Sequence, residues 1–270
     1  MTTSFVLKPG QSIPEPFPDG LVLLIDKPLG WTSFDIVNKV RYELAKRLGL
    51  KPKKLKVGHA GTLDPLATGL LVLCVGSYTK QIEKLQAMPK AYAGTFTFGA
   101  TTPSFDLEKA VNEVFSIDNL SDEKLQATVP QFTGIVMQAP PVFSAIKIDG
   151  KRVYKDARTG APVDMPERPV FIESLKIGPL YPVPVGRTEA QIISKKGASI
   201  YLHPDHAAGL QADFEVVCGK GTYIRSLAND IGMALDNGAY LSSLRRTLTG
   251  GFSVSDAWTI DAFVEACART

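Results

Sequence analysis

The chain has 270 residues, of which 44% are hydrophobic and 21% charged, and its formal net charge is +3. This composition is typical of a globular protein, and no apolar run approaches the roughly 20 residues of a membrane-spanning helix. The three cysteines include no C-x-x-C pair, so the sequence favours buried free thiols in a cytoplasmic protein over disulfides.

The first segments predict an irregular leader followed by a strand. Residues 1–20 are rich in proline and lack the apolar core of a signal peptide. The apolar run from Leu21 to Ile25 predicts a buried strand, and Pro28 and Gly30 then predict a turn.

Residues 32–49 have the spacing of an amphipathic helix. One apolar stripe is formed by Val37, Val40, Leu44 and Leu48. Thr32 or Ser33 can cap the first turn of this helix, and Gly49 ends it.

Positive charge is concentrated in residues 38–56, which hold eight Lys and Arg and a single Glu. Such asymmetry favours a polyanionic partner, although a solvated helix face would have the same pattern.

Residues 57–76, VGHAGTLDPLATGLLVLCVG, place one carboxylate, Asp64, in a glycine-rich and otherwise uncharged loop before an apolar strand. Glycines let a backbone or a ligand approach closely. The carboxylate could cap its own turn, or it could act on a substrate as a nucleophile. A phosphoaspartate is disfavoured, because the loop offers no further acidic groups for Mg²⁺.

The remaining segments mix strands and helices. Residues 91–99 alternate as a strand, residues 144–160 predict a strand, a turn and a short helix, and residues 213–239 predict a strand, a glycine turn and a helix. The lack of a regular βαβ rhythm favours an α+β fold. The GKGT stretch lacks the first glycine of a P-loop, and the HPDH stretch lacks a second pair of zinc ligands.

Six stretches follow one another in the order DKPLGWTS, GHAGTLDPLATGLL, KAY, SAIKIDGKRVYKDAR, GKGTYIRSLANDIG and LSSLRRT. Together they closely resemble the TruB family of tRNA pseudouridine synthases, the bacterial tRNA pseudouridine-55 synthases. The resemblance implies the pseudouridine synthase fold, an α+β domain with a mixed, largely antiparallel sheet, flanking helices and a central active-site cleft. It also implies isomerisation of uridine 55 in the T loop of tRNA, without cofactor or metal.

The resemblance assigns roles to four residues of the reaction. Asp64 would be the catalytic nucleophile, acting on a uridine that is flipped out of the RNA. Arg225 would pair with Asp64, Tyr223 would lie against the target base, and Tyr92 would stack on the flipped uracil. From the residues alone, Arg225 would be a solvent-facing helix residue and Tyr92 a core residue.

Further residues have supporting roles by the same resemblance. His59 would fill the space left by the extruded nucleotide, and Leu244 would line the base pocket, although a loop histidine and a core leucine explain them as well. Lys27 and Pro28 would support the Asp64 loop.

The cations expected to contact RNA phosphates come from two segments, residues 38–56 and 147–158. They are Lys51, Lys53, Lys54, Lys56, Lys147, Lys151 and Arg152.

The expected catalytic domain spans residues 21–252, with an insertion at 180–212. Residues 253–270 would be a short C-terminal tail, without the PUA-type RNA-binding domain of many relatives. Pro103 and Phe105 depart from the family's Thr/Asp-rich stretch, so contacts with the RNA loop are expected to differ there. We expect a cytoplasmic monomer that binds the T arm of tRNA, with no membrane and no obligate protein partner.

Two other functions fit parts of the pattern. A non-catalytic tRNA-binding protein would use the same basic surface, but the retained Asp64, Tyr223 and Arg225 count against it. The RNA-guided archaeal and eukaryotic branch needs accessory proteins and a PUA-type domain, and the short C-terminal stretch counts against it.

Overall fold

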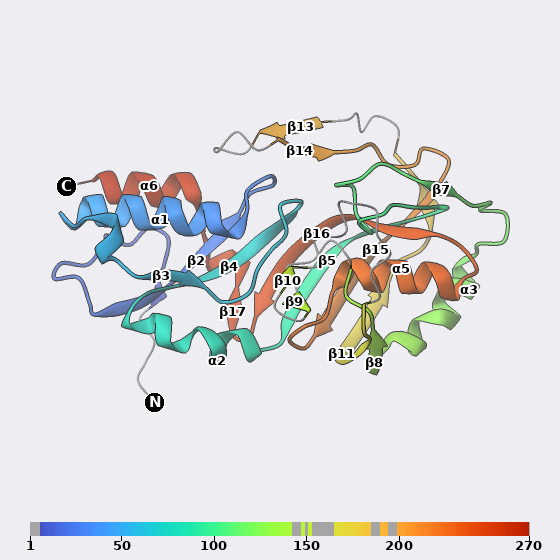
Figure 1. The fold of residues 1–270 in the computed structure, drawn as a ribbon, viewed down its shortest axis with the longest axis horizontal. Coiled ribbons are helices and arrows are strands. Elements are labelled where there is room, and N and C mark those ends of the chain that lie inside the picture. The colour runs from blue at the N-terminus through green and yellow to red at the C-terminus, as the bar shows by residue number, and fades with distance from the viewer. Residues whose placement is uncertain are drawn as a thin grey trace. The chain divides into compact units, whose positions relative to one another are not determined.

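The computed structural model describes residues 6–141, 147–148, 151–152, 165–184, 190–193 and 199–269. The chain forms two compact units: one of residues 1–92, 193–200 and 244–270, and the other of residues 93–192 and 201–243. Two strands, β5 (Lys90–Phe98) and β16 (Ala239–Thr249), begin in one unit and end in the other. Most of the helices and strands are labelled in Figure 1.

The sheet of the first unit is built on the antiparallel pair β2 (Gly20–Lys27) and β4 (Ala67–Gly76). Both strands are buried along nearly their whole length, as the continuous apolar runs predict for strands covered on both faces. Strand β3 (Val57–His59) pairs antiparallel with β4, and the second half of β16 pairs parallel with it, with Leu244 opposite Ala67.

Helix α1 (Ser33–Arg47) begins and ends where the sequence predicts. Thr32 is the N-cap, and a capping box forms because Thr32 accepts from the backbone N–H of Asp35 while Asp35 accepts from that of Thr32. The predicted stripe faces the core, with Leu48 partly buried as the C-cap. Figure 1 shows α6 (Ile260–Ala268) beside α1, and both helices contribute side chains to one hydrophobic cluster with β2 and β4.

The first and last segments of the chain are more ordered than the sequence predicts. Strand β1 (Val6–Leu7) pairs parallel with β2, and so does β18 (Trp258–Thr259). The indole Nε1 of Trp258 donates to the carbonyl of Leu7 at 3.0 Å. The leader and the tail thus contribute to the core of the first unit, because each carries large apolar side chains that bury there.

Short elements complete the first unit. They are η1 (Pro52–Lys54), η2 (Ser77–Gln81), α2 (Ile82–Ala87), β17 (Phe252–Ser253) and η4 (Val254–Asp256).

The sheet of the second unit contains β15 (Leu210–Cys218), β11 (Arg168–Ile177) and β8 (Gly134–Gln138), all antiparallel. The second half of β5 belongs beside β15, where the rings of Phe96 and Phe214 stack with centroids 3.9 Å apart. The strand predicted over residues 91–99 is confirmed, although Thr97 is buried together with Phe96 and Phe98, so burial does not alternate at its end.

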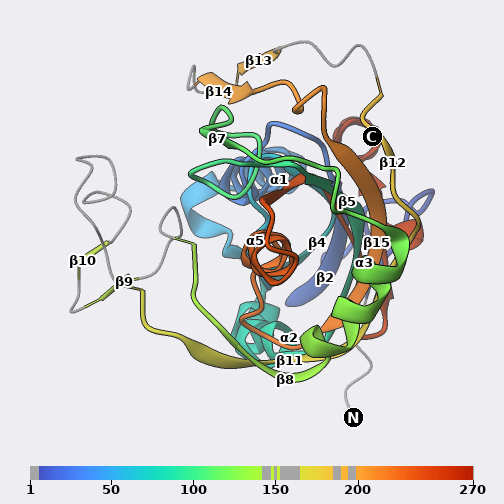
Figure 2. The same cartoon turned by 90° about the vertical axis from the view of Figure 1, so that its right-hand side faces the viewer.

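Helix α5 (Ile224–Ala234) follows β15 as predicted, and it buries Ile224, Leu227 and Ile231. Figure 2 looks nearly along this helix. Both units combine helices with strands, so the α+β prediction is confirmed.

The second unit also contains α3 (Asp122–Thr128) and η3 (Val129–Phe132). Its short strands are β6 (Ala100–Thr101), β7 (Glu113–Val114) and β12 (Tyr181–Pro182).

Two further strand pairs are β9 (Lys147–Ile148) with β10 (Lys151–Arg152), and β13 (Ala190–Ile193) with β14 (Ser199–Leu202). The expected insertion at 180–212 therefore includes β12, β13, β14 and the start of β15. The short helix predicted before residue 160 lies outside the described residues.

Candidate functional site

Asp64 lies in the loop between β3 and β4, and main-chain hydrogen bonds define the course of this loop. The N–H of Ala67 donates to the carbonyl of Asp64 at 3.1 Å, and the N–H of Gly30 donates to that of Pro65 at 2.9 Å. The side chain of Asp64 is half-buried. The turn after Asp64 is thus closed by its backbone carbonyl.

The residue before Asp64 is anchored by the first residue of α1. The buried hydroxyl of Ser33 donates to the carbonyl of Leu63 at 3.0 Å and accepts from its N–H at 2.8 Å. Both main-chain groups of Leu63 are therefore satisfied by one side chain, which attaches the loop to the start of the helix.

Lys27, at the end of β2, is fully buried below the exit of the loop. Its Nζ donates to the carbonyls of Trp31 (2.6 Å), Pro28 (3.0 Å) and Pro65 (3.4 Å). Burial lowers the pKa of Lys27 from its ordinary 10.5 to about 8, while the carboxylate of Asp64 acts in the opposite direction. The lysine predicted as a support is therefore also an electrostatic neighbour of Asp64.

Arg246, on β16, holds the entrance of the same loop and is 1% exposed. Its guanidinium donates to the carbonyls of Leu70 (2.7 Å), Gly61 (3.0 Å) and Thr62 (3.5 Å). Gly61 has φ +111°, and a Cβ there would lie 3.4 Å from Nη1 of Arg246. The loop glycine thus permits both the backbone conformation and the close approach of the guanidinium.

Neither Arg246 nor its neighbour Arg245 was assigned a role from the sequence. Arg245 makes a bidentate pair with Asp26, with N–O distances of 3.0 and 2.7 Å. Two adjacent arginines in a strand would have indicated a buried arginine. Successive side chains of a strand point to opposite faces, so if one arginine faces solvent the other faces the interior.

Three predicted substrate residues belong to the first unit and are half-buried. They are His59 on β3, Tyr92 on β5 and Leu244 on β16. Burial and the charge of Arg246 lower the pKa of His59 below 6.5, so its imidazole is neutral at pH 7. All three side chains are partly accessible. A purely core role for Tyr92 or Leu244 would require the side chain to be fully buried.

Lys90, two residues before Tyr92, is buried at the start of β5. Its Nζ donates to the carbonyls of Gln86 and Met88 at the end of α2. The lysine of the KAY stretch therefore caps the C-terminus of α2, where a cation interacts favourably with the unpaired carbonyls and the helix dipole.

Tyr223, the N-cap of α5, is held in the second unit by Gln138 at the end of β8. The backbone N–H of Tyr223 donates to Oε1 of Gln138 at 2.7 Å, and Nε2 of Gln138 donates to the Tyr223 carbonyl at 3.1 Å. The guanidinium of Arg168 lies 5.2 Å from the centre of the Tyr223 ring and donates to the carbonyl of Gly221 at 3.0 Å. The tyrosine is thus oriented from its backbone and from its ring.

Arg225 is 4% exposed, so the solvent-facing alternative is wrong. Its Nη1 donates to the carbonyl of Ser104 at 3.2 Å, and its Nε lies 3.8 Å from Oδ2 of the buried Asp106. Asp106 also accepts from the N–H of Glu108 at 3.0 Å. The stretch after β5 therefore supplies a buried counter-charge, Asp106, which was assigned no role from the sequence.

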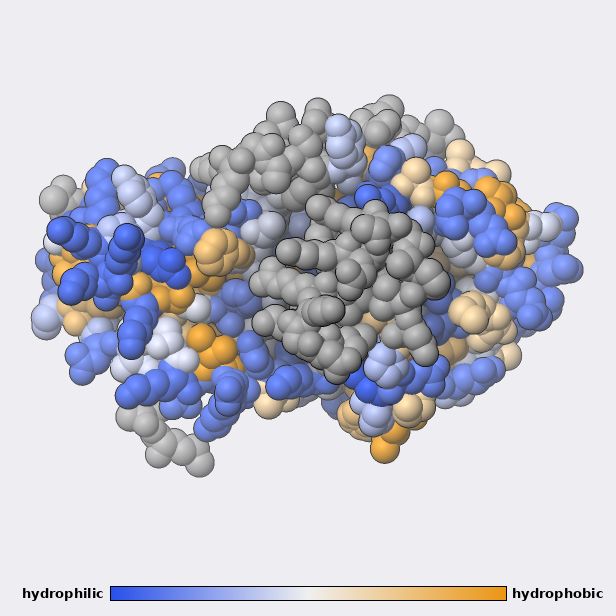
Figure 3. Space-filling view, in the orientation of Figure 1, coloured by the Kyte–Doolittle hydropathy of each residue, from blue (hydrophilic) through white to orange (hydrophobic). Residues whose placement is uncertain are grey.

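The four lysines predicted in the first basic segment are exposed. They are Lys51, Lys53, Lys54 and Lys56, on and beside η1. A groove of about 450 Å³ next to them is lined by Lys53, Lys56, Arg41 and Thr79, among others. Figure 3 shows mainly hydrophilic residues over α1, the helix that carries Arg41.

The second set of predicted cations lies on the β9–β10 hairpin, where Arg152 is opposite Lys147 and Lys151 is opposite Ile148. Their side chains are outside the described part of the structure. Within the described residues, no cluster of three or more His, Cys, Asp and Glu could hold a metal ion, and no helix is long and apolar enough to cross a membrane.

Family comparisons cover most of the chain. The model of the TruB family pseudouridylate synthase N-terminal domain matches residues 46–200, and that of the tRNA pseudouridylate synthase B C-terminal domain matches residues 225–270. The second match includes the residues expected as a tail.

Two curated relatives are similar to this chain over nearly their full length. The chain is 45% identical over 253 residues to a tRNA pseudouridine synthase B of Flavobacterium johnsoniae, covering 94% of this chain and 98% of that protein. It is 42% identical over 249 residues to a protein of the same name from Phocaeicola vulgatus, covering 92% and 94%.

Solved structures with the same fold are more distant. An H/ACA RNP bound to a substrate RNA containing 2'-deoxyuridine includes a chain with a TM-score of 0.56 and 22% identity, covering 96% of this chain and 61% of that one. A Cbf5-Nop10-Gar1 complex gives a TM-score of 0.56 and 22% identity, covering 98% and 66%. At this identity the likeness concerns the fold alone.

Proposed function

The chain belongs to the TruB family of pseudouridylate synthases, and we propose that it is a tRNA pseudouridine synthase that isomerises uridine 55 in the T loop of tRNA. The observation that carries this proposal is the 45% identity to a tRNA pseudouridine synthase B over 94% of the chain. The geometry of the Asp64 loop supports the assignment of its mechanism.

Asp64 is the proposed nucleophile. In the reaction the target uridine leaves the base stack, its N-glycosidic bond breaks, the uracil turns, and C5 bonds to C1' of the ribose. The proton lost from C5 is balanced by the proton that N1 gains, so the product is an isomer and no electrons are exchanged. An ionised carboxylate is needed, and Lys27 is an electrostatic neighbour of Asp64.

Arg225 is the proposed partner of Asp64 during the reaction. A guanidinium remains charged when buried and can bind a carboxylate through two N–H groups. Its contacts with Ser104 and Asp106 support this role, because they restrict the side chain before RNA binds.

The base itself is proposed to lie against aromatic and apolar side chains. Tyr92 would stack on the uracil, Tyr223 would contact it, and Leu244 would line the pocket. His59 would take the space that the flipped nucleotide leaves in the RNA. Their partial exposure supports these roles, since each presents a surface that a ligand can cover.

The RNA backbone is proposed to bind the two basic segments. The exposed lysines beside η1 and the groove lined by Lys53, Lys56 and Arg41 support phosphate contacts in the first segment. For the β9–β10 hairpin, the proposal rests on the sequence of Lys147, Lys151 and Arg152. The protein would act as a monomer in the cytoplasm, on the T arm and without an obligate protein partner.

The test is incubation of the purified protein with an unmodified tRNA transcript, followed by carbodiimide mapping of pseudouridine. We expect a single new pseudouridine in the T loop, and none with the Asp64→Asn variant. Tight binding of the transcript by wild type without any pseudouridine would contradict the proposal and favour a non-catalytic tRNA-binding protein.

A further inference from the structure

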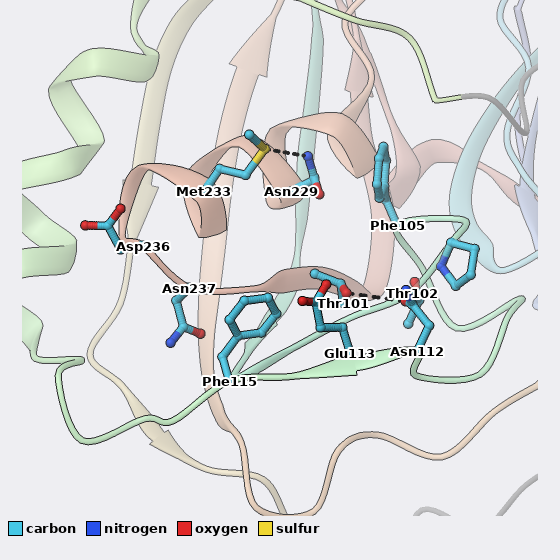
Figure 4. A pocket seen from close by; sticks show the side chains of 11 residues that line it. Thr101, Thr102, Phe105, Asn112, Glu113, Phe115, Asn229, Met233, Asp236 and Asn237 are labelled. Atoms are coloured by element: carbon cyan, nitrogen blue, oxygen red, sulfur yellow. Dashed lines mark hydrogen bonds between the residues drawn. The ribbon is translucent and has the colours of Figure 1, made fainter. Parts of the chain in front are cut away.

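The second unit contains a pocket that none of the roles above uses. It has a volume of about 490 Å³ and lies between the C-terminal half of α5, the β6–β7 hairpin and the turn from α5 to β16. Figure 4 shows Asn229 and Met233 entering from α5, Phe105 at one side, and Phe115 and Glu113 across from the helix. Its size is within the range of pockets that hold small molecules.

Two backbone conformations mark this pocket. Among the described residues, Phe105 (φ 59°) and Asp236 (φ 51°) are the non-glycine residues with positive φ, and both line it. Aspartate tolerates this region, but a phenylalanine rarely adopts it. Such strain concentrates at functional positions, so the placement of the Phe105 ring at the pocket points to a use for it.

The polar groups of the pocket divide into two classes. Asn237 is used by the fold, because its Oδ1 accepts from the N–H of Gly99 at 2.9 Å and its Nδ2 donates to the carbonyl of Ser116 at 2.8 Å. The Nδ2 of Asn229 donates to the sulfur of Met233 at 3.4 Å, a normal length for an N–H···S bond, and lies 3.5 Å from Oδ1 of its neighbour Asp230. A thioether sulfur is only a weak acceptor, so the amide of Asn229 can exchange this bond for one to a ligand at little cost.

The charge of the lining selects the chemistry of that ligand. The eleven lining residues include the carboxylates of Glu113 and Asp236 but no lysine or arginine. Neither carboxylate makes an ion pair with another described residue. Carboxylates repel a phosphate but accept hydrogen bonds from the amino group of a base, and an asparagine amide can bind an adenine edge through two hydrogen bonds. The rings of Phe105 and Phe115 offer the aromatic surface on which unstacked bases bind.

We infer that this pocket binds an unstacked RNA base that carries an exocyclic amino group, a nucleotide distinct from the target uridine. The inference rests on the proposed function, since it takes RNA as the ligand. The pocket also adjoins the support of Arg225, because Phe105 lies between Ser104 and Asp106 in the chain. A base seated against Phe105 would thus restrain the segment that orients Arg225.

The first test compares Asn229→Ala with Asn119→Ala, a matched change at an exposed asparagine that does not line the pocket. Alanine is a good helix former, so the α5 variant should fold, which circular dichroism would check. We expect Asn229→Ala to bind a full tRNA transcript about tenfold more weakly than wild type, with the slope of log affinity against log salt unchanged. A changed slope would identify a phosphate contact and overturn the inference, as would binding equal to that of Asn119→Ala.

The second test identifies the base with T-arm hairpins in which one loop nucleotide at a time is abasic. In wild type we expect one position other than the target uridine to weaken binding, and in Asn229→Ala the same lesion should have little further effect. If each abasic position weakens binding to Asn229→Ala by the same factor as it weakens binding to wild type, the pocket does not hold a T-loop base. A base elsewhere in the tRNA is then supported only if Asn229→Ala weakens binding of the full transcript and leaves hairpin binding unchanged.

These outcomes are separate from those of the proposed function. Failure of the proposed function would appear as absence of pseudouridine with the wild-type protein. Failure of the base-pocket inference would appear as equal tRNA binding by Asn229→Ala and Asn119→Ala. In that case wild type would still form pseudouridine, and the single-turnover rates of Asn229→Ala and wild type at saturating enzyme would be equal.

Discussion

Lys27 and Arg246 hold the two ends of the loop that carries Asp64, Lys27 through the carbonyl of Pro65 and Arg246 through those of Gly61 and Thr62. Both cations are almost fully buried, and their hydrogen bonds go to main-chain oxygens. Burying a charge costs free energy unless hydrogen bonds compensate for the lost water. The loop carbonyls provide those bonds only in this conformation, so the loop stabilises the buried cations and the cations stabilise the loop. This arrangement places Asp64 on a loop with little freedom to move.

Asp64→Asn should abolish pseudouridine formation and leave folding and tRNA binding close to wild type. The amide is nearly isosteric with the carboxylate but is a far weaker nucleophile. Carbodiimide mapping and filter binding on the same preparation would measure both quantities. Turnover at the wild-type rate would remove Asp64 from the mechanism.

Arg246→Lys should lower the free energy of unfolding by about 2 to 4 kcal/mol, because a single ammonium cannot reach three carbonyls and leaves buried acceptors unsatisfied. We also expect a fall in the single-turnover rate with little change in RNA affinity, since the loop of Asp64 loses its restraint. Arg245→Lys is the control, because its partner Asp26 lies outside that loop. Equal effects of the two changes on rate would argue against a specific role for Arg246.

The pKa of Lys27, about 8, predicts opposite effects of pH on stability and rate. The folded protein releases this proton near pH 8, whereas the unfolded chain keeps it until about pH 10.5. Between these values the unfolded state binds more protons, so this group makes the folded state more stable as pH rises. The single-turnover rate should fall over the same range, because a neutral amine has two N–H groups for three carbonyls and no charge beside Asp64.

The comparison for this pH effect is Lys27→Arg, which keeps its charge throughout. Denaturant titrations and single-turnover rates between about pH 7 and pH 9.5 would follow both proteins. An inflection near pH 8 that persists in Lys27→Arg would assign it to another group.

Arg225→Lys should reduce the chemical step strongly and tRNA binding only modestly. Lysine keeps the charge but loses the planar group that can bind a carboxylate through two donors. Single-turnover kinetics at saturating enzyme would separate the step from binding. Rates equal to wild type would contradict the proposed pairing of Arg225 with Asp64.

Replacing Lys53 and Lys54 with Gln should weaken tRNA binding at low salt and flatten its salt dependence. Each phosphate contact that is lost should reduce the slope of log affinity against log salt by about 0.7 to 0.9. The rate of the chemical step at saturating enzyme should not change. A filter-binding titration with an unchanged slope would indicate that these lysines only solvate the surface.

Elements with a local signal could be predicted from the sequence. The capping box at Thr32 and the apolar stripe of α1 both depend on residues within a few positions of one another. The helix α5 was predicted as well, but from the residues alone Arg225 was expected to face solvent. Its partners, Ser104 and Asp106, come from a distant segment, and helix periodicity carries no information about them.

Lys27 was predicted as a support of the site, but two other supports were missed for a related reason. Gln138 binds the main chain of Tyr223, and Arg246 binds main-chain oxygens of the Asp64 loop. Any residue type can provide those main-chain partners, so the sequence does not show which groups these two side chains bind, even where the arginine pair at 245 and 246 is itself noticeable. The pairing of β1 and β18 with β2 was likewise hidden, because it joins the two ends of the chain.

That pairing has a consequence for how the protein is made. The hydrophobic cluster of the first unit needs Trp258 and Phe263 as well as residues near the start of the chain, such as Leu7. On the ribosome, β2 and α1 emerge long before these partners exist, whereas residues 201–243 complete the second unit earlier. The core of the first unit can therefore close only after nearly the whole chain has been synthesised. A nascent chain stalled before α6 would expose that apolar surface to chaperones and proteases.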